Sequence, residues 1–336
     1  MRTAEFVTPR HPDKMCDQIS DSIVDWALTR DREARVAVET LGGHGNVHVV
    51  GEITVRGDTD DLPVAVKKIV AEITGRDDLH VDVAVSRQSP QIAQGVDLGG
   101  AGDQGIMRGY AVSETPNLMP REHELARSLC KHLFALFPHD GKTQVTLDNA
   151  GEIAVLVASF QSVSGKNLEE AMREWFSQTD YAKSGAEHIR FYANPAGDWT
   201  IGGFEADTGL TGRKLAVDNY GPRFPVGGGA FSGKDATKVD RSGAYIARRV
   251  AVDLMRERGG TDEMIEVELA YAIGVAEPVD IHVAAFKKDG AKEIITSLTK
   301  YDLTPGGIIR ALDLRRPQYA QTAKWGHFGN GFAWDK

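Results

Sequence analysis

The 336-residue sequence has few cysteines, no long apolar run and no excess of positive charge. Its two cysteines, Cys16 and Cys130, are far apart and match no zinc or disulfide spacing, so we expect a reducing, cytoplasmic location. No apolar signal segment follows the N-terminus, and no run of about 18 apolar residues occurs, so we expect no membrane span. The formal net charge of -9 argues against a nucleic-acid partner, although a local cationic pocket for a small anion stays open.

Glycine, by contrast, is abundant, and three in a row open the most informative segment, residues 227–240. Consecutive glycines disfavour helix and strand but let the backbone approach a ligand closely. Lys234 and Lys238 follow together with Asp235 and Asp240, a combination that suits a polyphosphate and its magnesium. The P-loop pattern G-x-x-x-x-G-K-[ST] fails at Asp235, and no buried strand precedes it, so we predict a phosphate loop of another kind. The alternative is an ordinary glycine-rich surface loop.

An amphipathic helix is predicted over residues 12–30, where apolar residues recur at helical spacing. Asp13, Asp17 and Asp21 follow one another at every fourth position and make the opposite face acidic. His11 precedes the helix, at an N-terminus where anions are favoured. For Asp13, the alternative to a functional role is a charge that only complements the helix dipole.

A unit of a two-stranded hairpin followed by a helix recurs along the chain at intervals of roughly 110–120 residues. This recurrence predicts an α+β fold of three repeated domains, related by pseudo-threefold symmetry, each a sheet covered by helices on one face. We expect the domains to span residues 1–98, 99–202 and 203–336. The predicted strands are 35–40, 47–55, 81–86, 143–147, 153–160, 188–192, 264–273 and 279–286. The predicted helices after the first are 61–74, 120–137, 168–177, 241–258 and 291–298, and residues 41–46 are expected to form a turn.

Several further segments contain residues that could bind a substrate or take part in catalysis. Residues 88–105 have no apolar periodicity and are rich in glycine, so they read either as a lid that closes over a substrate or as a linker. Lys142 lies at a predicted turn, and Trp199 is an aromatic that could stack on a base. Glu39 and Glu52 lie in otherwise apolar strands, where a carboxylate is either functional or on the solvent face.

Together these features resemble the S-adenosylmethionine synthetases, the methionine adenosyltransferases. The resemblance implies that the methionine sulfur attacks C5′ of ATP and that the displaced triphosphate is hydrolysed to pyrophosphate and phosphate. A leaving group with about four negative charges needs a cluster of cations, whereas sulfur needs no general base. The resemblance extends over essentially the whole chain and rests on residues 11–14, 51–54, 88–90, 100–105, 209–214, 227–240, 271–278 and 326–329.

The resemblance also implies roles for individual residues. The catalytic set is His11, Lys142, Arg213, Lys214 and Lys234. The residues implied to bind ATP are His11, Asp140, Lys142, Trp199, Asp207, Arg213, Lys214, Ala230 and Lys234. Those implied to bind L-methionine are Glu52, Gln88, Asp103, Asp207 and Lys238. Asp13 and Asp240 would hold Mg²⁺, with two ions per site, and Glu39 would hold K⁺. The family's site is shared by two subunits of a dimer, which can pair into a tetramer.

The sequence departs from the family pattern at several positions. Arg10 stands where the family has glycine, Asp198 replaces a usually basic residue, and Val226 stands where histidine is frequent. The lid between residues 94 and 102 is shorter than usual, which predicts weaker binding of methionine with catalysis preserved. Two other readings stay open, an ATP-dependent phosphotransferase that forms ADP and a nucleotide-binding relative without turnover.

Overall fold

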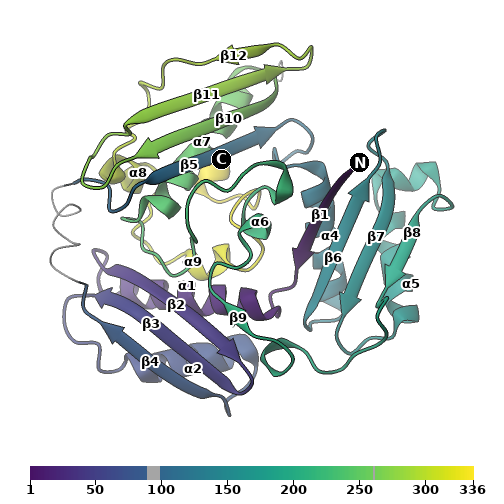
Figure 1. Cartoon of the computed structure of the whole chain (residues 1–336), viewed down its shortest axis with the longest axis horizontal. Helices are drawn as coiled ribbons and strands as arrows, with labels where there is room; N and C mark the ends of the chain where they lie inside the picture. The colour runs from purple at the N-terminus through teal and green to yellow at the C-terminus, as the bar shows by residue number, and fades with distance from the viewer. Residues whose placement is uncertain (89–98, 260–261) are drawn as a thin grey trace.

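Three four-stranded sheets, each with helices packed on one face, make up the chain in the computed structural model (Figure 1). The structure describes residues 1–88, 99–259 and 262–336. Most of the predicted lid, residues 89–98, lies outside the described residues. The α+β class and the three-repeat organisation predicted from the sequence are confirmed.

The first sheet has the strand order β4-β3-β2-β9. Helices α1 and α2 pack against it, and the crossover through α2 makes β3 and β4 parallel. The elements are α1 (Pro12–Arg30), β2 (Arg35–Gly43), β3 (Asn46–Thr54), α2 (Leu62–Thr74), β4 (His80–Ser86) and β9 (Gly209–Leu210). The turn expected over residues 41–46 is present but shorter than predicted, because Gly42 and Gly43 continue the pairing of β2 with β3. Only His44 and Gly45 form the turn, both with positive φ.

The second sheet repeats this plan with the order β1-β6-β7-β8. Its strands β7 and β8 are parallel and joined through α5, while α4 covers β1 and β6. The elements are β1 (Arg2–Val7), α4 (Arg121–Leu136), β6 (Gly141–Leu147), β7 (Ile153–Phe160), α5 (Gly165–Ser177) and β8 (Arg190–Ala193). The repeat predicted for residues 143–192 is therefore present, with an additional strand at the N-terminus of the chain.

The third sheet, of order β12-β11-β10-β5, departs from the plan. Its elements are β5 (Gly105–Val112), α7 (Val239–Glu257), β10 (Asp262–Tyr271), β11 (Asp280–Lys287) and β12 (Lys292–Ile294). The helix predicted over residues 291–298 is wrong, because Lys292–Ile294 pairs antiparallel with β11. Helix α7, which lies between β5 and β10 in the chain, packs against these two strands instead, so the sheet is covered without a crossover helix.

The three sheets are linked by strands that come from distant segments of the chain. Strand β1 joins the central sheet and β5 joins the last one, although both precede the other strands of those sheets in sequence. One apolar core continues from α1 through α7 into the first and third sheets, while the second sheet has its own core. Figure 1 shows α6 (Leu215–Asp218) and α9 (Tyr319–Thr322) in the region between the sheets, with α8 (Pro305–Ala311) near the third sheet. Among the described residues, no helix combines the length and apolarity that crossing a bilayer requires.

Candidate active site

Helix α1 presents His11 and Asp13 at its N-terminus. His11 is the N-cap residue, and its Nδ1 accepts a hydrogen bond from the Asp13 backbone N–H at 3.2 Å. Burial, assisted by the nearby Lys214 cation, lowers the pKa of His11 to about 3. The imidazole is therefore neutral near pH 7 and carries its proton on Nε2, which leaves that nitrogen as a donor.

The Asp13 carboxylate gathers a second segment of the chain onto the helix N-terminus. It accepts hydrogen bonds from the Leu210 N–H at 3.0 Å and from Lys214 Nζ at 2.6 Å, and Arg213 Nε lies 3.4 Å away. Burial by itself would raise the pKa of Asp13, but the bonds from Lys214 and Leu210 outweigh it and hold the pKa below its ordinary value. Asp13 is thus ionised and linked to both cations.

The central repeat adds Asp140 and Lys142 at the start of β6. Asp140 is buried and accepts a hydrogen bond from the Gly203 N–H at 2.9 Å. Burial raises the pKa of Asp140 to about 6. Lys142 is exposed, and its charge, like that of Asp207, influences the pKa of His11. We call the residues that meet here the His11 cluster: His11, Asp13, Asp140, Lys142, Asp207, Arg213 and Lys214.

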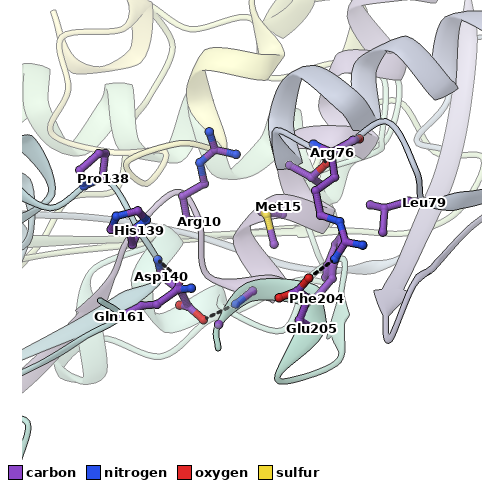
Figure 2. A pocket seen from close by; sticks show the side chains of 13 residues that line it. Arg10, Met15, Arg76, Leu79, Pro138, His139, Asp140, Gln161, Phe204 and Glu205 are labelled. Carbon is purple, nitrogen blue, oxygen red and sulfur yellow. Dashed lines mark hydrogen bonds and ion pairs between the residues drawn. The ribbon is translucent and has the colours of Figure 1, made fainter. Parts of the chain in front are cut away.

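A cavity of about 320 Å³ adjoins Asp140, between the first two repeats (Figure 2). Its apolar wall is formed by Met15, Leu79 and Phe204. Arg10, the departure from the family pattern beside His11, also lines it and donates to the Ile73 carbonyl near the C-terminal end of α2. A cation is favourable at a helix C-terminus, so Arg10 has a structural role that ties α1 to α2.

The glycine loop, residues 227–240, folds around the Asp240 carboxylate in the first turn of α7. Asp240 accepts hydrogen bonds from the Gly229 N–H at 2.9 Å and from Lys234 Nζ at 2.6 Å. A Cβ on Gly228 would lie 2.9 Å from an Asp240 oxygen, and one on Gly227 would lie 2.0 Å from the Ile106 carbonyl oxygen. These two glycines are therefore required by the packing of the protein itself, and not only by a ligand.

Lys238, at the N-cap of α7, forms an ion pair with the buried Asp235. Asp235 also accepts a hydrogen bond from the Val36 N–H at 2.7 Å, which anchors the loop to the first sheet. Its pKa is lowered, because the Lys238 charge outweighs the opposing effect of burial. Lys238, which the resemblance places at methionine, is thus held by a partner within the protein.

A second hollow, of about 370 Å³, lies between the first sheet and the glycine loop. Glu39, Glu52, Ala230 and Lys234 line it, so residues expected at potassium, methionine and ATP share one space. Ala230 also packs against Gly212, since its Cβ lies 2.5 Å from the position that a Cβ on Gly212 would take. Gly212 directly precedes the Arg213 and Lys214 cations.

Three other expected site residues lie apart from these contacts. Gln88 donates its backbone N–H to Thr54 Oγ1 at 3.2 Å, and Asp103 is exposed and accepts from the Gln104 N–H at 2.8 Å. Trp199 is half-buried. Within the described part of the chain, no hydrogen bond or ion pair brings these three side chains to the His11 cluster.

Sequence reasoning assigned no role in the site to a set of buried charges on α1 and α7. Asp17 and Asp21, which the pattern placed on an acidic helix face, have no solvent exposure and accept backbone N–H groups from the two cationic loops. Lys14 forms ion pairs with Asp17 and with Asp218, and Arg241 forms one with Asp21. The spacing of Asp13, Asp17 and Asp21 at every fourth residue was the sequence feature that could have indicated such a role.

Fold and site together define a class, a three-repeat α+β enzyme with a cationic, carboxylate-containing centre suited to a polyphosphate. The chain matches the sequence models of the S-adenosylmethionine synthetase N-terminal domain over residues 1–93, central domain over 98–199 and C-terminal domain over 201–336. It is 42% identical over 381 aligned positions to the S-adenosylmethionine synthase of Leifsonia xyli subsp. xyli (strain CTCB07), covering 99% of this chain and 95% of the relative. It is 43% identical over 376 positions to that of Nocardia farcinica (strain IFM 10152), covering 97% and 92%. The chain belongs to the S-adenosylmethionine synthetase family.

Proposed function

We propose that this chain joins L-methionine to ATP through attack of the sulfur on C5′, releasing triphosphate that is then cleaved to pyrophosphate and phosphate. Membership of the family makes the chain a methionine adenosyltransferase with ATP and methionine as substrates. The observation that carries the detailed proposal is the convergence of Arg213, Lys214 and Lys142 on His11 and Asp13 from separate parts of the chain.

Four cations and one neutral donor would act on the departing triphosphate. Lys142, Arg213, Lys214 and Lys234 stabilise its developing charge, and fixed charges of this kind are commonly the largest contribution to catalysis. His11 donates a hydrogen bond through Nε2 without adding a charge. We assign Asp140, Trp199, Asp207 and Ala230 to the rest of ATP, and Glu52, Gln88, Asp103, Asp207 and Lys238 to methionine.

Metal ions belong to this family's chemistry, and we assign Mg²⁺ to Asp13 and Asp240 and K⁺ to Glu39. Carboxylate oxygens are the ligands that Mg²⁺ prefers, and Mg²⁺ is commonly held by one or two carboxylates together with substrate phosphates. Bound Mg²⁺ would neutralise phosphate charge, while the lysines that pair with these carboxylates, Lys214 and Lys234, supply the adjoining cations.

We further propose that two subunits share each site and that dimers can pair into tetramers. Exposed apolar side chains on strands of the first and third sheets support an interface there. They are Leu41, Val50, Ile106, Ile281 and Ile294. We place the enzyme in the cytoplasm, since Cys16 and Cys130 are both buried and unpaired.

The test is a product analysis with ATP, methionine, Mg²⁺ and K⁺. S-adenosylmethionine, pyrophosphate and phosphate should form in equal amounts, because one triphosphate is released and cleaved for each sulfonium formed. Formation of ADP, or nucleotide binding without any product, would contradict the proposal.

A further inference from the structure

Helix α1 carries three carboxylates that each hold a backbone amide of a cation-bearing loop. Asp13 accepts from the Leu210 N–H at 3.0 Å, and Asp17 accepts from the Gly212 N–H at 2.8 Å. Asp21 accepts from the Gly233 N–H at 2.9 Å. Because an α-helix rises 1.5 Å per residue, successive carboxylates are about 6 Å apart along the axis. The helix therefore sets a fixed spacing between the two loops.

The Arg213–Lys214 segment is held on both sides. Asp17 binds the Gly212 amide just before it, and α6 begins just after it and ends at Asp218. The buried ammonium of Lys14 joins the two anchors, 2.9 Å from Asp17 Oδ2 and 2.5 Å from Asp218 Oδ1. Lys14, Asp17 and Asp218 are almost wholly shielded from solvent, so they act on the cations through the backbone and not through a ligand.

Lys234 is held in the same way on the other loop. Asp21 binds the Gly233 amide just before it. The Arg241 guanidinium binds both Asp21 oxygens at 2.7 Å and donates to the Lys234 carbonyl at 2.8 Å. Neither Asp21 nor Arg241 has any solvent exposure. Charge-assisted hydrogen bonds of this kind are stronger and geometrically stricter than neutral ones.

We propose that Asp17 and Asp21, with Lys14 and Arg241, are positioning residues that fix the spacing of the catalytic cations around the triphosphate. The proposal rests on the proposed function and extends it to groups that never touch substrate. Preorganised charges act only when correctly placed, and a misplacement of about 1 Å can cost on the order of 10²-fold in rate.

The first test is Arg241→Lys with inorganic tripolyphosphate as the probe. Lysine keeps the charge beside Asp21, but its single ammonium cannot bind both oxygens and also reach the Lys234 carbonyl. We expect tripolyphosphate hydrolysis to fall about 10-fold or more, with the KM for methionine little changed. Arg249→Lys is the matched control, since Arg249 lies on the same helix and pairs with Asp253 away from both loops. It should retain wild-type turnover.

Asp17→Asn provides a second variant that is expected to fold. Removing the Asp17 charge leaves Lys14 paired with Asp218, so no unbalanced cation is buried. An amide can accept the Gly212 N–H or face Lys14 with its oxygen, but not both. We expect the same loss of tripolyphosphate hydrolysis, with the thermal unfolding midpoint close to that of the wild type.

Wild-type hydrolysis by either folded variant would overturn the positioning role. A failure of the proposed function would look different from a failure of the positioning role. In that case the wild type itself would hydrolyse no tripolyphosphate and form no S-adenosylmethionine. In that case, the affinity for tripolyphosphate, measured by calorimetry, tests the positioning role. Affinity at least 10-fold weaker than in Arg249→Lys supports the positioning role, and equal affinity overturns it.

Discussion

Single residues in the site owe their protonation states to burial and to the neighbours that the fold supplies. Burial lowers the pKa of His11 to about 3, which keeps it a neutral donor. Asp13 is buried as well, yet bonds from Lys214 and Leu210 lower its pKa and keep it charged. Asp140 accepts hydrogen bonds from backbone amides and none from a lysine, and burial raises its pKa to about 6. The balance between desolvation and hydrogen bonding therefore decides each charge separately.

Asp140 predicts a specific dependence of stability on pH. Its pKa is raised in the folded chain, so its contribution to stability is complete below pH 3.8 and is lost as pH rises through about 6. Relative to Asp140→Asn, the wild type should lose on the order of 3 kcal/mol of unfolding free energy between pH 4 and 7. Urea denaturation of both proteins at several pH values measures this, with Glu170→Gln as a control for loss of one carboxylate. A difference that stays constant over this range would contradict the prediction.

Lys142 should matter for turnover and not for folding. Its side chain is exposed, and exposed substitutions usually change stability by about 0.5 kcal/mol or less. Loss of one charge directed at the departing triphosphate should lower turnover on the order of 10²-fold. Lys142→Met is compared with Lys166→Met, an exposed lysine on α5 of the same repeat. Near-normal S-adenosylmethionine formation by Lys142→Met would remove it from the catalytic set.

Among the elements, helix α1 is packed against other parts of the protein on two of its faces. Its apolar stripe enters the core, with Ile19 and Ile23 fully buried. Its acidic stripe is also buried, because Asp17 and Asp21 each accept an amide from a loop. A helix that is buried on two faces is held rigidly, and rigid elements position functional groups better than loops do.

Asp198 departs from the family pattern, and its position beside the N-terminus of α5 explains this departure. Its carboxylate accepts a hydrogen bond from the Gly165 N–H at 2.7 Å, in the first turn of α5. A carboxylate there satisfies an amide at the helix N-terminus and complements its dipole. Asp198→Ala should therefore lower the unfolding free energy by about 1 kcal/mol. Asp198→Asn, which can still accept the bond, should lose less.

Urea denaturation of the two Asp198 variants measures the effect. The paired comparison separates the hydrogen bond from the charge, since only alanine removes both. A midpoint for Asp198→Ala equal to that of the wild type would show that this contact does not stabilise α5.

At the scale of the whole molecule, interlocked sheets bring the site residues together. The first repeat contributes α1, the second contributes β6, and the connection into the third contributes the Arg213–Lys214 segment and the glycine loop. Each sheet is completed by a strand from another part of the chain, β9, β1 or β5. The repeats therefore hold one another in place without a separate linker domain.

The proposed dimer predicts that charges on the exposed sheet surfaces abolish assembly and activity together. Leu41 and Ile281 are 41% and 42% exposed on the first and third sheets. A Leu41→Asp/Ile281→Asp double variant should sediment as a monomer and lose activity, because a charge in an apolar interface is left without a partner. Val64→Asp, on the 74% exposed outer side of α2, is the control. A fully active monomeric wild type would refute the proposal.

Local patterns in the sequence determined much of this protein. The spacing of apolar residues with Pro12 at the first turn predicted α1 over residues 12–30, and the structure has the same bounds. The sequence also indicated the hairpins of the first two repeats and the family resemblance. Each of these depends on residues that are close in sequence. The helix predicted over residues 291–298 failed because β11 offered an open edge, to which β12 adds.

Only the tertiary structure decided which partners these local elements have. The acidic stripe of α1 was visible, but nothing nearby in the chain identified the Gly212 and Gly233 amides that it holds. The placement of β1 and β5 in sheets formed by later strands was equally hidden. Periodicity states which face of an element is buried, whereas its partner depends on which sheet edges and polar groups remain unsatisfied once distant segments have packed.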